Sequence, residues 1–206
     1  MRRIIIIVLF TFIITATAIA QENSRRIEMK SAIITMSSEL MEQTLITKKY
    51  LDNYGLKFAQ FTVIPYFEDG ERKETLMMGR IRNEGTDTTV DYINKVLTAQ
   101  KDESDVINFL NLTEETIRKY KIKKLGEEDV CGKPCVIYSM SYKSEGVNTK
   151  DQVWVWKGIT LKRRVTSFAQ DREVVAVDIQ EDVPIDSSVF VVPDYPLKSW
   201  PDKAKN

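Results

Sequence analysis

The stretch QVWVWKGITLKRRVTS, residues 152–167, decides the fold. Trp154 and Trp156 alternate with Val153 and Val155, and a Lys-Gly turn then leads into a second, basic strand. Because successive side chains of a strand point to opposite faces, the tryptophans lie on one face and the valines on the other. Apolar residues on both faces are unusual for a sheet with a solvated side. The stretch therefore predicts a hairpin in a sheet that is covered on each face.

The same doubling of apolar residues recurs in two earlier segments, residues 58–63 and 76–78. A curved sheet that wraps around a helix buries its concave face, and a sheet larger than one helix can fill leaves an apolar cavity. The alternative is that these side chains pack only against one another and the helix. The side chains predicted to line a ligand cavity are Trp154, Trp156, Phe58, Phe61, Met77 and Met78.

Strands and turns follow one another at even spacing through most of the chain. We expect strands within 27–40, within 43–67 on both sides of a turn at 52–55, and within 73–83 and 88–100. Further strands are expected at 134–143, 151–158, 159–168 and 173–183. One helix is predicted over 111–125, with Thr113 as its N-cap, acidic residues in its first turn and lysines near its end. The pattern indicates an antiparallel meander, mainly β with minor α.

Residues 1–20 have the pattern of a secretory signal: two arginines, an apolar run from Ile4 to Ile14, and small residues before Ala20. We predict cleavage after Ala20, with an uncleaved anchor as the alternative, and a single domain over 21–206 without a stable membrane span. The chain has 30 basic and 30 acidic residues, so loss of Arg2 and Arg3 leaves 28 against 30, a net charge of −2. A nucleic-acid partner is not expected.

No histidine occurs in the sequence, which excludes the common histidine-dependent triads and metal sites. No phosphate-binding glycine loop or nucleophile elbow is present among the glycines. The acidic run Glu127–Asp129 lacks the glycine-centred calcium loop and is interpreted as an exposed strand end. We therefore expect a protein that is not an enzyme and that has no metal or cofactor.

The two cysteines, Cys131 and Cys135, flank a Gly-Lys-Pro turn between β-rich segments. We predict a structural disulfide across the mouth of a hairpin, because an exported protein meets an oxidising compartment. A redox pair is the alternative, although three residues rather than two separate the cysteines.

The segments 119–140 and 153–167 resemble those of the periplasmic carriers and receptors of outer-membrane lipoproteins, the LolA/LolB-like proteins. In that family a strand with a Gly-Lys turn and a Cys-x-x-Tyr strand precede a tryptophan-rich strand and a "Lys-Gly-x-x-Leu-Lys" turn. The ending at 183–190 and the turn within 50–57 are also similar.

This resemblance implies a strongly curved antiparallel half-barrel, with one or two helices packed against its concave face. It further implies a periplasmic protein that binds lipid or lipoprotein, a carrier-like role in outer-membrane lipoprotein sorting, with an acyl chain in the cavity. Only residues 21–26 precede the first strand here, whereas family members usually begin with an amphipathic helix. The alternative is a non-carrier interaction or envelope-sensing module, in which an exposed sheet edge or the basic run Lys162–Arg164 meets an envelope protein or anionic headgroups.

Overall fold

The structure is a computed structural model that describes residues 25–40, 43–83, 86–101, 107–144, 147–166 and 171–198. Its strands are β1 (Ala32–Leu40), β2 (Gln43–Asp52), β3 (Lys57–Glu68), β4 (Glu71–Asn83), β5 (Thr86–Asp91), β6 (Val96–Lys101), β7 (Lys123–Val130), β8 (Lys133–Ser144), β9 (Val147–Trp156), β10 (Ile159–Thr166) and β11 (Asp171–Glu181). The helix α2 (Glu114–Tyr120) and the 3₁₀ turn η1 (Ser187–Phe190) complete the described elements. The predicted signal, residues 1–20, lies outside the described residues.

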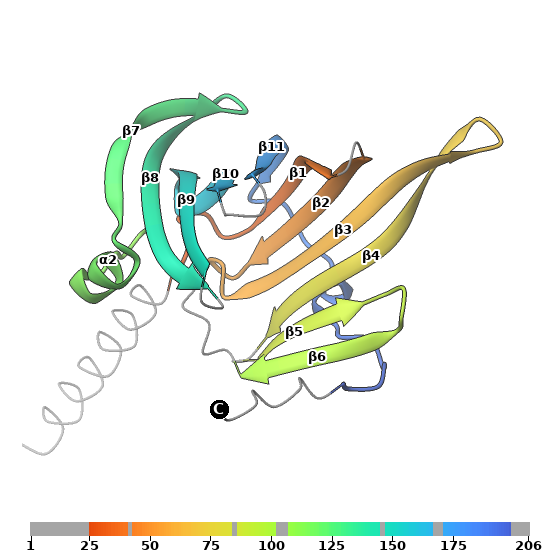
Figure 1. Cartoon of the computed structure of the whole chain (residues 1–206). Coiled ribbons are helices and arrows are strands. Elements are labelled where there is room, and N and C mark those ends of the chain that lie inside the picture. The colour runs from red at the N-terminus through yellow and green to blue at the C-terminus, as the bar shows by residue number, and fades with distance from the viewer. Residues whose placement is uncertain are drawn as a thin grey trace, which may run out of the picture.

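All strands belong to one antiparallel sheet in the order β6-β5-β4-β3-β2-β1-β11-β10-β9-β8-β7, which is not closed into a barrel. The sheet is bent into a half-barrel, with β7–β9 standing over one end of it (Figure 1). Register shifts interrupt the ladders of β1 with β11, β3 with β4, β7 with β8 and β9 with β10. Such bulges bend a strand and increase its twist, so they account for the curvature. The predicted fold class is confirmed.

Among the described connections, tight turns join β2 to β3, β3 to β4, β7 to β8 and β9 to β10. Lys157 and Gly158, for example, both have positive φ, 47° and 83°, between the paired residues Trp156 and Ile159. Two central residues with positive φ form the turn whose twist matches that of a β-hairpin, and glycine adopts this conformation without strain.

Two elements of the structure differ in length from those predicted from the sequence. The helix begins after Thr113, whose side chain accepts a hydrogen bond from the Thr116 N–H as expected, but it ends at Tyr120 because Lys121 is left-handed with φ 51°. The strand expected within 88–100 is a hairpin of β5 and β6. The Asp91 carboxylate accepts hydrogen bonds from the backbone N–H groups of Ile93 and Asn94, which fixes the turn.

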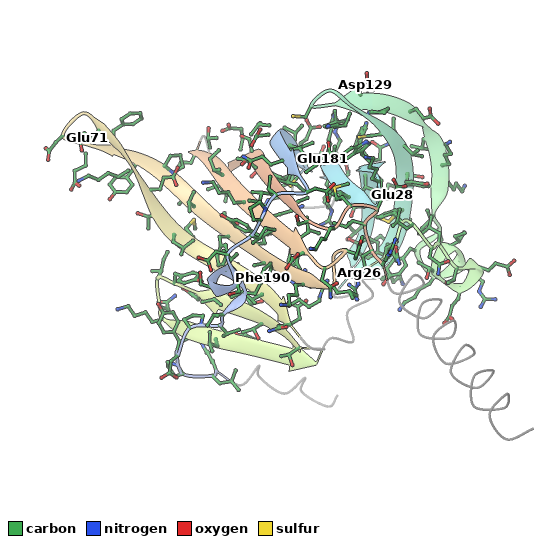
Figure 2. All side chains as sticks on the ribbon, turned by 180° about the vertical axis from the view of Figure 1, so that it is seen from behind. Arg26, Glu28, Glu71, Asp129, Glu181 and Phe190 are labelled. Atoms are coloured by element: carbon green, nitrogen blue, oxygen red, sulfur yellow. The ribbon has the colours of Figure 1, made fainter. Side chains whose placement is uncertain are left out.

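The two faces of the sheet have different covers. We call the face that carries Phe58 and Val153 the groove face, and the other the outer face. The segment after β11 runs across the outer face of β2–β6, where Phe190 packs in a cluster with Ala59 and Ile81 (Figure 2). On the groove face, residues 107–120 pack over β8 and β9. The sheet is thus covered on its outer face at the β2–β6 end and on its groove face at the β8–β9 end.

No helix among the described residues has the length and apolar character needed to cross a membrane.

Candidate functional site

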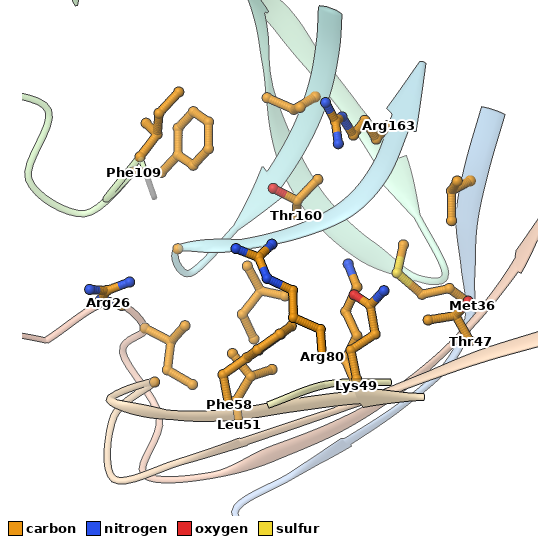
Figure 3. Close-up of a pocket in the computed structure, with 18 of the residues that line it drawn as sticks. Arg26, Met36, Thr47, Lys49, Leu51, Phe58, Arg80, Phe109, Thr160 and Arg163 are labelled. Atoms are coloured by element: carbon orange, nitrogen blue, oxygen red, sulfur yellow. The ribbon is translucent and has the colours of Figure 1, made fainter. Parts of the chain in front are cut away.

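A groove of about 580 Å³ lies on the groove face, between strands β1–β4 and strands β8–β10 (Figure 3). Its volume falls within the range of about 300–1,000 Å³ that is usual for small-molecule sites. Apolar side chains form much of its wall, among them Ile27, Leu51, Phe58, Phe109, Val153 and Ile159.

The wall above β8 and β9 comes from the segment that contains α2. Phe109 lies against Tyr138 with ring centroids 5.3 Å apart, and Tyr120 meets Tyr142 edge-on at 5.8 Å. Phe109, Tyr120 and Tyr138 belong to a cluster around Val153, which fixes the segment against the sheet. The described helix is short, so this cover leaves the groove accessible.

Lys49 is the basic residue that β2 contributes to the groove lining. On β2, the residues Thr47, Lys49 and Leu51 point into the groove, whereas Lys48 is on the outer face, as strand alternation requires. Burial, and then the positive charge of Arg163, lower the pKa of Lys49 from 10.5 to about 8. Within the described residues its ammonium group has no hydrogen bond and no ion pair.

Two buried aspartates accept hydrogen bonds from three of the arginines that line the groove. Asp151 on β9 is 2% exposed and accepts hydrogen bonds from the Arg163 Nε at 2.8 and 3.1 Å and from the Arg163 Nη2 at 2.6 Å. Asp87 on β5, also 2% exposed, accepts from the Arg80 Nε at 2.8 Å and from the Arg82 Nη2 at 3.3 Å. Burial raises the pKa of Asp87, but the two arginines outweigh it and leave the pKa below its ordinary value.

The described lining carries five basic residues, namely Arg26, Lys49, Arg80, Arg82 and Arg163. Asp151 in the lining and Asp87 behind it offset two of these charges, which leaves a formal charge of +3. The groove therefore combines apolar wall residues with a net positive charge.

Of the side chains predicted to line a cavity, Phe58 lies in the groove lining. Trp154 and Trp156 are buried on the outer face, 4% and 7% exposed, in a cluster that also contains Cys135 and Val130. The Trp154 indole N–H donates a 2.8 Å hydrogen bond to Glu128. The Lys133 and Lys157 ammonium groups lie 4.8 and 4.7 Å from the Trp156 ring centroid.

The other predicted lining residues are not among those that line the groove. Phe61 is on the outer face, 6.0 Å from Tyr50 and 6.3 Å from Tyr92 between ring centroids. Met77 is the residue without a partner in the β3–β4 register, and Met78 is 52% exposed. The structure does not bring these three residues to Phe58.

The sequence interpretation missed Lys49, Asp151 and Arg163. Strand alternation could have indicated two of them, because Asp151 is on the same face as Val153 and Lys49 is on the same face as Leu51. Following the valine face of residues 151–156, rather than the tryptophan face, would have found Asp151.

The predicted disulfide is wrong for this structure, in which both cysteines are free. Cys131 and Gly132 form the two-residue turn between Val130 and Lys133, so Cys131 is exposed at the tip of the hairpin. Cys135 lies two residues into β8, where its cross-strand partner is Glu128. The cysteines therefore do not face each other across the hairpin, and burial raises the pKa of the Cys135 thiol to about 11.

Comparison with known proteins bears on the fold alone. No protein-family model matches the sequence, and no curated protein matches it. The structure is similar to that of an uncharacterised conserved protein from Thermus thermophilus, with 10% identity, a TM-score of 0.51, and coverage of 89% of this chain and 99% of that chain. This likeness shows a shared fold.

Two looser structural matches were also found. One is the Pseudomonas aeruginosa MucA/MucB complex, at 12% identity and a TM-score of 0.47, covering 79% of this chain and 56% of that chain. The other is a putative outer membrane lipoprotein-sorting protein domain from Vibrio parahaemolyticus, at 15% identity and a TM-score of 0.36, covering 84% of this chain and 94% of that chain.

Proposed function

We propose that the chain is an exported binding protein that holds the acyl chain of a lipid or lipoprotein in the groove, in a carrier-like rather than catalytic role. The observation that carries this proposal is an accessible groove of about 580 Å³ with an apolar wall on the concave face of an open half-barrel. Burial of an acyl chain contributes about 0.8 kcal/mol per CH₂ group, so a chain of ordinary length would bind without any covalent step. The signal-like residues 1–20 support export.

The walls of the groove suit an aliphatic guest. Leu51 and Phe58 contribute apolar surface from β2 and β3, and Phe109 faces them from the segment before α2 (Figure 3). The Phe109 ring is held by Tyr138, so this part of the wall is preformed. A preformed apolar wall reduces the entropy that binding would otherwise cost.

The proposal is tested by titrating delipidated protein with a fluorescent fatty acid. Thr160 points into the groove, so Thr160→Trp fills part of it and should weaken saturable binding by at least about tenfold, the equivalent of two lost CH₂ contacts. Thr35→Trp is the matched control, because Thr35 is half-buried on the outer face, in register with Lys48 and away from the groove. Absence of saturable binding to the wild-type protein, or equal loss in both variants, would contradict the proposal.

The alternative function, an interaction module, would use the basic run Lys162–Arg164 to contact an acidic partner, but these three residues are already paired. Lys162 pairs with Glu128 at 3.5 Å, and Arg163 is hydrogen-bonded to Asp151. The Arg164 guanidinium contacts Glu173 at 2.6 Å. Each charge of the run therefore has a carboxylate partner within the chain, which lowers its value for attracting an acidic partner.

A further inference from the structure

Binding of an acyl chain would not require Lys49, because an acyl chain has no charge for its ammonium group to pair with. Its ammonium group faces a space walled partly by apolar side chains, and no carboxylate among the described residues pairs with it. A buried charge without a partner costs folding free energy, so a protein with no use for it would gain stability by losing it. Its position in the groove points to a partner that is not part of the chain.

Arg163 provides a second set of donors on the opposite wall. Its Nε and Nη2 are occupied by Asp151 and the Tyr142 hydroxyl, but its Nη1 has no hydrogen bond within the described residues. Figure 3 shows Lys49 reaching up from the β2 side of the groove and Arg163 coming from the β10 side. An anion between them would accept from an ammonium and from a guanidinium that Asp151 already fixes in orientation.

We propose that Lys49 and Arg163 bind the anionic headgroup, a phosphate or a carboxylate, of the amphipathic molecule whose acyl chain occupies the apolar part of the groove. This inference rests on the proposed function and adds the polar half of the ligand. Phe109 and Arg163 lie at different ends of the groove in Figure 3, so one guest can contact the aromatic wall and the cations together.

The surroundings of Lys49 favour an anion over a neutral headgroup. Its strand neighbours in register, Ile34 on β1 and Gln60 on β3, are uncharged. The charged and titratable groups that line the groove are Arg80 on β4, Tyr142 on β8, Asp151 on β9 and Arg163 on β10, together with Arg26, Arg82 and Tyr120. Asp87 and Asp151 are both engaged by arginines. A bound anion would thus supply the negative charge that the groove lacks.

Calorimetric titration with two ligands of equal chain length tests the inference. Dodecyl phosphate carries the anion, monolauroylglycerol carries a neutral head, and both are used below their critical micelle concentrations. We expect wild-type protein to bind dodecyl phosphate at least about tenfold more tightly, as hydrogen bonds to charged groups predict. Lys49→Met should lower the affinity for dodecyl phosphate toward that for monolauroylglycerol and so remove most of the preference. Lys48→Met is the matched control, since Lys48 is exposed on the outer face of the same strand, and it should keep the full preference.

The outcomes separate the two proposals. If neither ligand binds, the proposed function fails and the inference fails with it. If both bind wild-type protein equally, or if Lys49→Met keeps the preference, the headgroup inference alone is overturned. Inorganic phosphate tests the source of the anion: we expect it to bind far more weakly than dodecyl phosphate. Equal affinity would show a free-anion site and overturn the assignment to a lipid headgroup.

The preference should also depend on pH. A phosphate monoester is fully ionised above about pH 7.5, because its second pKa is near 6. Raising the pH from about 7.5 to 9.5 takes Lys49 through its pKa of about 8, so the wild-type preference should fall, whereas that of Lys49→Met stays flat. Burial raises the pKa of Tyr142 above its ordinary value of 10, so this hydroxyl does not titrate in that range. A preference that is constant across this range would overturn the role of Lys49.

Discussion

Replacement of Lys49 by methionine should make the protein more stable at neutral pH. Methionine has a similar length and no charge to desolvate. The lowering of the Lys49 pKa from 10.5 to about 8 corresponds to about 3 kcal/mol, at about 1.4 kcal/mol per pKa unit. Lys49 is half-buried and opens onto the groove, where water relieves part of this cost. We therefore expect the free energy of unfolding to rise by about 1–3 kcal/mol.

The sign of this effect can be followed with pH. Between about pH 8 and 10.5 the folded protein binds fewer protons at Lys49 than the unfolded chain does. The stability of the wild-type protein should consequently increase with pH across that window, relative to Lys49→Met. Above about pH 10.5 the lysine is neutral in both states, and the advantage of the variant should shrink to the difference in apolar burial.

Urea unfolding at pH 7 and at pH 10.5 measures both quantities. Lys48→Met serves as the control for loss of a lysine from the same strand, and it should change the stability by less than about 0.5 kcal/mol at either pH. A Lys49→Met variant less stable than wild type at pH 7 would refute the reasoning, because it would mean that Lys49 has a stabilising partner in the folded chain.

Three further results are expected. Gly158→Ala should lower the free energy of unfolding by at least about 2 kcal/mol more than Gly132→Ala does. A Cβ atom at Gly158 would overlap the Arg26 carbonyl oxygen, whereas nothing lies within 4 Å of a Cβ atom at Gly132. Equal losses in urea unfolding would contradict the close approach of Gly158 to Arg26. Asp151→Asn should lower the free energy of unfolding by about 1.5–3 kcal/mol in urea, because Asp151 is buried with Arg163. Glu173→Gln, which breaks an exposed pair with Arg164, should lower it by less than about 1 kcal/mol. A larger loss in Glu173→Gln than in Asp151→Asn would contradict the burial of the Asp151–Arg163 pair. Iodoacetamide should modify the exposed Cys131 in the native protein and reach the buried Cys135 only after unfolding, as counted by intact mass; protection of both without reductant would show a disulfide.

The local elements of the fold could be read from the sequence because their causes are local. The turn at Lys157-Gly158, the Thr113 cap and the strand alternation around Val153 each depend on a few neighbouring residues. The helix was predicted too long because nothing in the sequence indicated that Lys121 would be left-handed. The Cys131–Cys135 prediction failed for a related reason: the turn takes only two residues, so the cysteines are offset along the hairpin rather than opposite each other.

The candidate site depended on information that a strand does not carry. Alternation placed Trp154 and Val153 on different faces, but both faces are buried, so composition alone gave no means to choose the concave one. The predicted cavity lining includes both tryptophans, whereas the structure places them under lysine side chains on the outer face. Lys49 was overlooked because an alternating lysine in a strand normally indicates a solvated face.

The sequence by itself determined the hairpins, the short capped helix and a mainly β chain with two apolar faces, because these follow from side-chain alternation and turn chemistry over a few residues. Only the tertiary structure decided which face is concave and which charges meet there. That choice depends on bulges and on pairing between distant segments, such as β1 with β11, which bring Lys49 and Arg163 to opposite walls of one groove. Curvature is a property of the assembled sheet, and no single strand specifies its direction.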